Sequence, residues 1–236
     1  MKIAIISIFT LVSIQLMAQV TTAPYFKTMI PIKHIYVPVG FDSNDLSEVV
    51  IEGQLPDLCY KAPEVYISRD TKDIKIKVVA YKSSDKTLGC PRVKVPFIEV
   101  VNTGILERGD YRLLGNEKTK FQKNSFLNVA QSVKGTVDDY IYAKVESVDF
   151  DGYKRVTLKG YNPSDCFEFD KVEVYGNGKD TYSVLPILKQ VSETCVEKEV
   201  KFAYEFDLPD TIQRNKILLH IRAMNGKSFN RIIRKN

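Results

Sequence analysis

The 236-residue chain has no tryptophan and only two histidines, and it lacks the short motifs of common catalytic centres. There is no Gly-x-Ser-x-Gly, so the sequence offers no nucleophile turn of an α/β-hydrolase. Gly176-Asn-Gly178-Lys179 lacks the Gly-Lys-Ser/Thr ending of a phosphate-binding loop. There is no Cys-x-x-Cys pair either, although structural zinc sites need closely spaced ligands. These absences predict a protein that is not an enzyme, holds no metal and uses no cofactor.

Long apolar runs are also missing. The run from Ile3 to Leu16 is interrupted by polar residues and is shorter than the roughly 20 residues that span a bilayer. It follows one positive charge at Lys2 and precedes the small residue Ala18, which is typical of a secretory signal. We predict a signal peptide at residues 1–18, secretion to the periplasm or the cell exterior, and a mature chain that does not span the membrane. The next cysteine is Cys59, so no lipid anchor is expected.

The composition indicates a folded, strand-rich protein. Apolar residues make up 44% of the chain and charged residues 27%, which argues against disorder. Thirteen tyrosines and twelve phenylalanines favour strands, because aromatic side chains pack well on a pleated surface.

An internal repeat organises the chain. Ile51–Tyr60 and Leu158–Phe167 share the pattern apolar-x-Gly-x-x-Pro-x-x-Cys-aromatic, with matching residues 107 positions apart. Cys90 and Cys195 then each begin Cys-x4-Val-x-Phe. Agreement over this many positions indicates a tandem duplication.

Three segments predict hairpins: residues 111–121, 172–184 and 217–233. The last contains Asn225-Gly226, which supplies the positive φ angles of a tight turn. Short strands with frequent turn signals favour β-sandwiches of the immunoglobulin-like kind. Upstream of each repeat motif, Ile35-Tyr36 resembles Ile141-Tyr142.

We therefore expect an all-β fold: two tandem immunoglobulin-like β-sandwich domains, each with one disulfide inside the domain, after the signal peptide. The predicted boundaries are residues 19–33 for an N-terminal extension, 34–123 for repeat one, 124–138 for a linker and 139–236 for repeat two. The spacing of Phe126, Ala130 and Val133 suggests a short helix in the linker.

Four cysteines in a secreted chain predict two disulfides. Of the three possible pairings, repeat symmetry selects Cys59 with Cys90 and Cys166 with Cys195, separated by 31 and 29 residues. These bridges are expected to stabilise the fold and to take no part in chemistry.

The signal peptide followed by Gly-x-x-Pro-x-x-Cys-aromatic and Cys-x4-Val-x-Phe resembles a loose group of secreted bacterial proteins with immunoglobulin-like repeats. The resemblance covers about Ile35 to the C-terminus. It implies the sandwich fold and no shared activity.

Charge gives the main functional indication. The net charge is +5. Residues 211–236 contain no aspartate or glutamate and seven positive residues: Arg214, Lys216, Arg222, Lys227, Arg231, Arg234 and Lys235. Five of these on the terminal hairpin are candidate ligand-binding residues: Arg222, Lys227, Arg231, Arg234 and Lys235. They could attract an anionic envelope component or a protein partner. Equally, they could be a solvated edge that prevents aggregation. Nucleic acid is a poor candidate, because no recognition module is present.

Two smaller features of the sequence allow more than one interpretation. Asp42–Asp45 and Asp149–Gly152 could offer oxygen ligands to calcium, but β-turns prefer the same residue types. His220 alternates with apolar neighbours, so we expect its ring on a solvated or half-buried strand face.

The sequence thus predicts a secreted, non-catalytic binding or interaction protein of the bacterial cell envelope or extracellular space. The alternatives are an enzyme or enzyme inhibitor with a site in the inter-domain cleft, and a purely structural envelope component. Converging carboxylates beside a histidine with a shifted pKa in that cleft would favour the enzyme.

Overall fold

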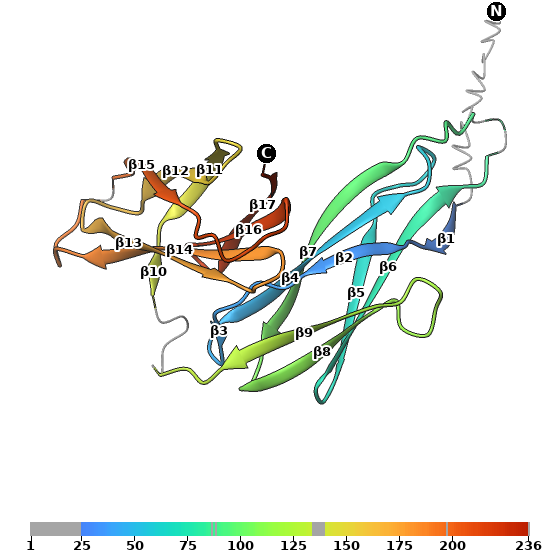
Figure 1. Ribbon diagram of the computed structural model, residues 1–236, viewed down its shortest axis with the longest axis horizontal. Helices are drawn as coiled ribbons and strands as arrows, with labels where there is room; N and C mark the ends of the chain where they lie inside the picture. The colour runs from blue at the N-terminus through green and yellow to red at the C-terminus, as the bar shows by residue number, and fades with distance from the viewer. Residues whose placement is uncertain (1–24, 86, 88, 134–139, 197, 236) are drawn as a thin grey trace, which may run out of the picture.

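The computed structural model describes residues 25–85, 87, 89–133, 140–196 and 198–235. Throughout these residues the regular elements are β-strands, and they form two β-sandwiches that lie side by side (Figure 1). The predicted all-β fold with two sandwich domains is confirmed. The predicted signal peptide, residues 1–18, lies outside the described residues, as do residues 134–138 of the predicted linker.

The first sandwich is built from β1 (Tyr25–Met29), β2 (Ile32–Tyr36), β3 (Phe41–Asp42), β4 (Leu46–Leu55), β5 (Glu64–Asp70), β6 (Asp73–Ser83), β7 (Val95–Ile105), β8 (Gly109–Gly115) and β9 (Lys123–Ala130). One sheet has the order β1-β6-β8-β9-β3, with β5 also paired to β6, and the other has the order β2-β4-β7. Alternate side chains point inward, so residues such as Val49, Ile51 and Ile74 are fully buried between the sheets.

The second sandwich is built from β10 (Ile141–Tyr142), β11 (Lys144–Phe150), β12 (Arg155–Asn162), β13 (Phe167–Gly176), β14 (Thr181–Gln190), β15 (Val200–Asp207), β16 (Lys216–Ala223) and β17 (Lys227–Arg234). One sheet has the order β10-β14-β16-β17, with β13 also paired to β14, and the other has the order β11-β12-β15. Its core includes Val156, Leu158, Tyr182 and Leu219.

The strand pairings repeat between the two sandwiches, as a tandem duplication predicts. β6 and β8 pair in parallel, and so do β14 and β16. Gly53 pairs with Phe97, and Gly160 pairs with Phe202. Both glycines allow a close approach: a Cβ would lie 2.1 Å from the Phe97 ring at Gly53, and 1.9 Å from the Lys144 carbonyl oxygen at Gly160.

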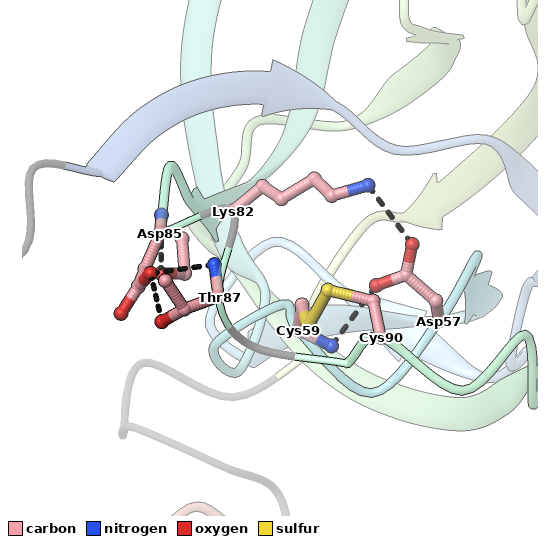
Figure 2. The surroundings of a disulfide bond; sticks show 7 residues. Asp57, Cys59, Lys82, Asp85, Thr87 and Cys90 are labelled. Atoms are coloured by element: carbon pink, nitrogen blue, oxygen red, sulfur yellow. Dashed lines mark hydrogen bonds and ion pairs between the residues drawn. A yellow bond between two sulfur atoms is a disulfide. The ribbon is translucent and has the colours of Figure 1, made fainter.

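Both predicted disulfides are confirmed, with Cα–Cα distances of 5.5 Å for Cys59–Cys90 and 5.2 Å for Cys166–Cys195. Figure 2 shows the first bridge beside Asp57, whose carboxylate accepts hydrogen bonds from the Cys59 amide at 2.9 Å and from Lys82 at 3.0 Å. In the chain-entropy model, each bridge stabilises its sandwich by roughly 3–4 kcal/mol.

The three predicted hairpins are present as β8–β9, β13–β14 and β16–β17. Asn225 and Gly226 have φ angles of 64° and 63°, as a tight two-residue turn requires. In the first hairpin the second strand begins at Lys123, so Phe121 lies in the turn.

Two sequence expectations differ from the structure around the domain boundaries. Residues 123–130 form β9 of the first sandwich, so the predicted linker start and the short helix there are wrong. Leu127 and Val129 are buried whereas Phe126 is 66% exposed, which is the two-residue period of a strand. Residues 25–29 and 32–33, placed in an N-terminal extension, form β1 and the start of β2.

The upstream match between the repeats also needs correction. Ile141–Tyr142 is β10, which pairs with β14 as β1 pairs with β6. Ile35 and Tyr36 belong to β2, which pairs with β4. By strand pairing, Ile141–Tyr142 therefore corresponds to β1 and not to Ile35-Tyr36 of β2.

Candidate functional site

The contact between the two sandwiches is formed by outward faces of strands whose inward faces build the two cores. Tyr36 and Val50 of the first sandwich form a buried cluster with Leu218 of β16, and Ile232 of β17 packs against it. Residues 47–51 of β4 and 217–223 of β16 are buried on both faces for this reason. Polar clusters lie on both sides of this apolar contact.

The first polar cluster is buried and centres on Arg222. Its guanidinium is 2.9 Å from the carboxylate of Asp45 and donates hydrogen bonds to the carbonyl of Gly40 and to the hydroxyl of Tyr142. Arg222 and Asp45 are 7% and 4% exposed. The pair therefore lies inside the contact, where its charges are compensated by each other.

His220 lies next to this ion pair and is only 1% exposed. Its Nδ1 is 2.9 Å from the amide oxygen of Asn230 and 3.3 Å from the carboxylate of Glu48. Glu48 also accepts hydrogen bonds from Ser228 and Asn230. The expectation of a solvated or half-buried histidine is wrong, because β4 covers the outward face of β16.

Burial lowers the pKa of His220 below its ordinary value, and Arg222 acts in the same direction; Glu48 and the hydrogen bond to Asn230 offset only part of this effect. The cavity beside the ring has a volume of about 20 Å³. That is room for about one water molecule and far below the several hundred Å³ of a typical ligand pocket. Although two carboxylates and a histidine with a shifted pKa meet here, the arrangement holds the sandwiches together and has no space for a substrate.

The second polar cluster borders solvent through His34 and Arg214, while its central carboxylate, Asp180, is buried. His34 Nε2 of the first sandwich lies 2.8 Å from a carboxylate oxygen of Asp180 in the second, and Arg214 approaches the same carboxylate at 3.6 Å. Burial raises the pKa of Asp180, but hydrogen bonds from His34, Asn177 and Thr181 and the charge of His34 more than offset this, so the pKa is lowered overall.

Two adjoining grooves lie beside this bridge, with volumes of about 490 Å³ and 370 Å³. They share His34, Asp180 and Arg214. The first is also lined by Tyr36, Glu52 and Lys216, and the second runs along the start of β9. We call these two grooves the inter-sandwich cleft.

Positive side chains from both sandwiches line the inter-sandwich cleft: Lys33, Lys123, Lys179, Arg214 and Lys216. Its two carboxylates are already engaged, Asp180 with His34 and Glu52 with Lys216 and the Tyr36 hydroxyl. Burial raises the pKa of Glu52, but the hydrogen bonds from Lys216 and Tyr36 and the charges of Lys216 and Lys33 lower it overall. The cleft therefore carries an excess of positive charge.

The structure separates the five candidate residues of the terminal hairpin. Arg222 is buried in the contact, which makes it inaccessible to an external ligand. Lys227 and Arg231 are exposed, and the charge of Arg231 acts on Asp149 of β11, away from the cleft. Arg234 pairs across the strands with Lys216, which lines the cleft, whereas the Lys235 ammonium donates a hydrogen bond to the Ile212 carbonyl.

Sequence reasoning missed the cleft residues of the first sandwich, Lys33, His34 and Lys123. No motif marks them, because they come together only when the two sandwiches pack. A partial signal was present in Lys216, Leu218, His220 and Arg222, which alternate with apolar residues and so share one face of a strand.

Both acidic segments form turns, since the Asn44 amide donates to the Asp42 carboxylate and the Asp42 amide donates to the Asp45 carboxylate. Asp151 accepts hydrogen bonds from the backbone amides of Tyr153, Lys154 and Arg155, as expected for a turn. Asp45 is engaged by Arg222. Among the described residues, Asp57, Cys59 and Cys90 form a group with metal-ligand atoms within 4.8 Å, but both sulfurs belong to the disulfide.

Comparison with known proteins adds information on fold only. Residues 49–125 match the family model of the ORF11 beta-sandwich domain. The match runs from β4 to β9 of the first sandwich and covers less than half of the chain. No curated protein and no solved structure matches the chain. Within the described residues, no helix is long and apolar enough to cross a membrane.

Proposed function

We propose that the protein is a secreted, non-catalytic binding protein that takes an anionic ligand in the inter-sandwich cleft. The observation that carries the proposal is the convergence of five lysine and arginine side chains from both sandwiches on an open cleft whose carboxylates are already paired. Arg214 and Lys216 are partners of these carboxylates, so five positive side chains face two negative ones, and the remaining positive excess would attract a ligand with several negative charges.

Two further features support a binding role outside the cytoplasm. Each sandwich is closed by a disulfide, and disulfides persist in oxidising compartments such as the periplasm and the cell exterior. The buried contact around Val50 and Leu218 holds the two walls of the cleft together. A rigid cleft loses little entropy when a ligand binds.

The enzyme hypothesis rests on the His34–Asp180 pair, since a carboxylate that orients an imidazole is part of many catalytic centres. In the part of the chain that the structure describes, no serine or threonine hydroxyl is hydrogen-bonded to His34. The imidazole thus has a carboxylate partner but no nucleophile to activate, which is why we prefer binding over catalysis.

The test is titration calorimetry of the mature protein with tripolyphosphate as a probe, at low and at moderate salt. We expect binding that weakens with salt, and weakens by roughly tenfold in the variant Lys33→Gln/Arg214→Gln, which removes one cation from each sandwich. The matched control is Lys94→Gln/Lys201→Gln, two exposed lysines that do not line the cleft. Equal affinity in both variants, or no binding to the wild type, would contradict the proposal.

A further inference from the structure

Both histidines of the chain lie at the contact between the sandwiches, and each faces a carboxylate of the opposite sandwich. His34 of β2 binds Asp180, and His220 of β16 approaches Glu48 of β4. His34 is partly exposed at the cleft, with 34% of its side chain accessible, whereas His220 is fully enclosed. Only His220 must therefore leave its surroundings, or change them, before it can take up a proton from solvent.

The hydrogen bonds of His220 suit the neutral imidazole. Its Nδ1 has two oxygen partners, on Asn230 and Glu48, so this nitrogen carries the hydrogen. Its Nε2 is buried and has no hydrogen-bond partner among the described residues. A proton on Nε2 would create a second buried donor with no acceptor among the described side chains and backbone, which is costly.

The titratable groups near the His220 ring lie on elements of both sandwiches. The carboxylate of Glu48 reaches it from the first sandwich, and that of Asp45, which lines the same cavity, is bound to Arg222. Arg222 lies on the same strand and repels an imidazolium. The remaining titratable groups lining the adjacent cavity are Tyr142 and Lys227. Among the described residues, Glu48 is the carboxylate that lies next to the ring, and it also accepts hydrogen bonds from Ser228 and Asn230.

We propose that His220 is an acid-sensitive latch: the neutral ring holds the two sandwiches together, and protonation favours their separation. This inference does not depend on the anionic ligand, since His220 does not line the inter-sandwich cleft.

The direction of the pH effect follows from the lowered pKa of the buried ring. In a separated form, the ring would be solvated and would titrate near its ordinary pKa of 6.5. Between that value and the lower pKa of the closed form, only the separated form binds the proton. The closed contact is thus fully stable above about pH 6.5, and the ratio of separated to closed molecules rises by up to about tenfold for each pH unit below it.

The test is small-angle X-ray scattering of the whole mature protein between pH 7.5 and 5.0, for the wild type, His220→Asn and His34→Gln. Asparagine places an amide near the position of Nδ1 but does not titrate, and glutamine preserves a donor near Nε2 for Asp180. We expect the radius of gyration to rise on acidification in the wild type and in His34→Gln, and to stay constant in His220→Asn. A constant radius in the wild type, or an unchanged response in His220→Asn, would overturn the latch.

Nuclear magnetic resonance gives a second readout if His220→Asn fails to fold. In His34→Gln a single histidine remains, so its ring signal needs no further assignment. We expect this signal to keep the neutral chemical shift until the radius of gyration increases. A ring that becomes protonated while the radius stays constant would also overturn the proposal.

Discussion

Replacing Arg222 by methionine should destabilise the contact between the sandwiches far more than the same change at an exposed arginine. The guanidinium of Arg222 has bonds to Asp45, to the Gly40 carbonyl and to the Tyr142 hydroxyl, all in a region shielded from water. Methionine fills a similar volume but leaves the Asp45 carboxylate buried without its cation. Breaking one side of a buried ion pair in this way costs about 3–5 kcal/mol.

The matched control is Arg112→Met on β8. Arg112 makes a two-pronged bond to Asp73 with distances of 2.6 and 2.7 Å, yet 61% of its side chain is exposed. An exposed ion pair contributes about 0–1 kcal/mol, so this variant should unfold almost like the wild type. Comparable losses in the two variants would refute the argument that burial determines the effect.

The assay is urea unfolding at pH 7.5, followed by tyrosine fluorescence because the chain has no tryptophan. In Arg222→Met we expect the unfolding curve to separate into two transitions, since the sandwiches lose the contact that couples them. The double variant Asp45→Asn/Arg222→Met should recover at least about 1.5 kcal/mol relative to the sum of the single changes. Strict additivity would show that the two side chains do not depend on each other.

Two further predictions concern each sandwich by itself. Gly160→Ala should destabilise the second sandwich by about 3 kcal/mol or more, because its Cβ would overlap the Lys144 carbonyl. The control is Gly89→Ala, where a Cβ would have no atom within 4 Å and stability should change by less than about 1 kcal/mol. Urea unfolding monitored by circular dichroism measures the free energy of unfolding of both variants. Reduction with dithiothreitol should lower the melting temperature of both sandwiches, since each loses a disulfide that contributes roughly 3 kcal/mol. An unchanged melting temperature in calorimetry would contradict the stabilising role of Cys59–Cys90 and Cys166–Cys195.

The sequence predicts what is local or repeated. The Cys pairing followed from the near-equal spacing in two copies, and the β16–β17 hairpin followed from Asn225-Gly226 between two apolar runs. The strand β9 was missed because Phe126 is apolar yet exposed, which disturbs the two-residue period that marks a strand.

The candidate site was predicted only in part, because it depends on how the two sandwiches pack. The basic terminal segment was recognised, but sequence could not separate Arg222, which is buried, from Arg234, which is exposed. That distinction is set by Gly40 and Asp45, more than 170 positions earlier in the chain, which bind the Arg222 guanidinium and leave Arg234 at the end of β17 exposed. Lys33 and His34 carry no motif at all.

The two repeats have diverged in the residues on the outward faces of their equivalent strands, and this explains why each repeat uses a different strand for the contact. The contact uses Glu48, Val50 and Glu52 on the outward face of β4, and the equivalent positions of β12, each 107 residues later, are Arg155, Thr157 and Lys159. The inward residues at the same register, Val49 and Ile51 against Val156 and Leu158, stay apolar and fully buried.

The other partner of the contact, β16, diverges from its equivalent in the same way. By their parallel pairing, Leu113 of β8 corresponds to Leu219 of β16, and both are fully buried. The outward neighbour Leu218, which is buried in the contact, corresponds to the exposed Arg112.

Each repeat thus has one outward face that packs against the other repeat, at β4 or β16, and one outward face with exposed charged residues, at β8 or β12. A head-to-tail contact can continue indefinitely when both faces of every unit are adhesive. Here the two free faces carry Arg112 on β8 and Arg155 and Lys159 on β12, all exposed. Charged outer faces end a row of repeats. We therefore expect the packing to stop at two sandwiches. Neutral residues at these three positions should promote the formation of filaments. Sedimentation that reveals concentration-dependent filaments of the wild type would contradict this expectation.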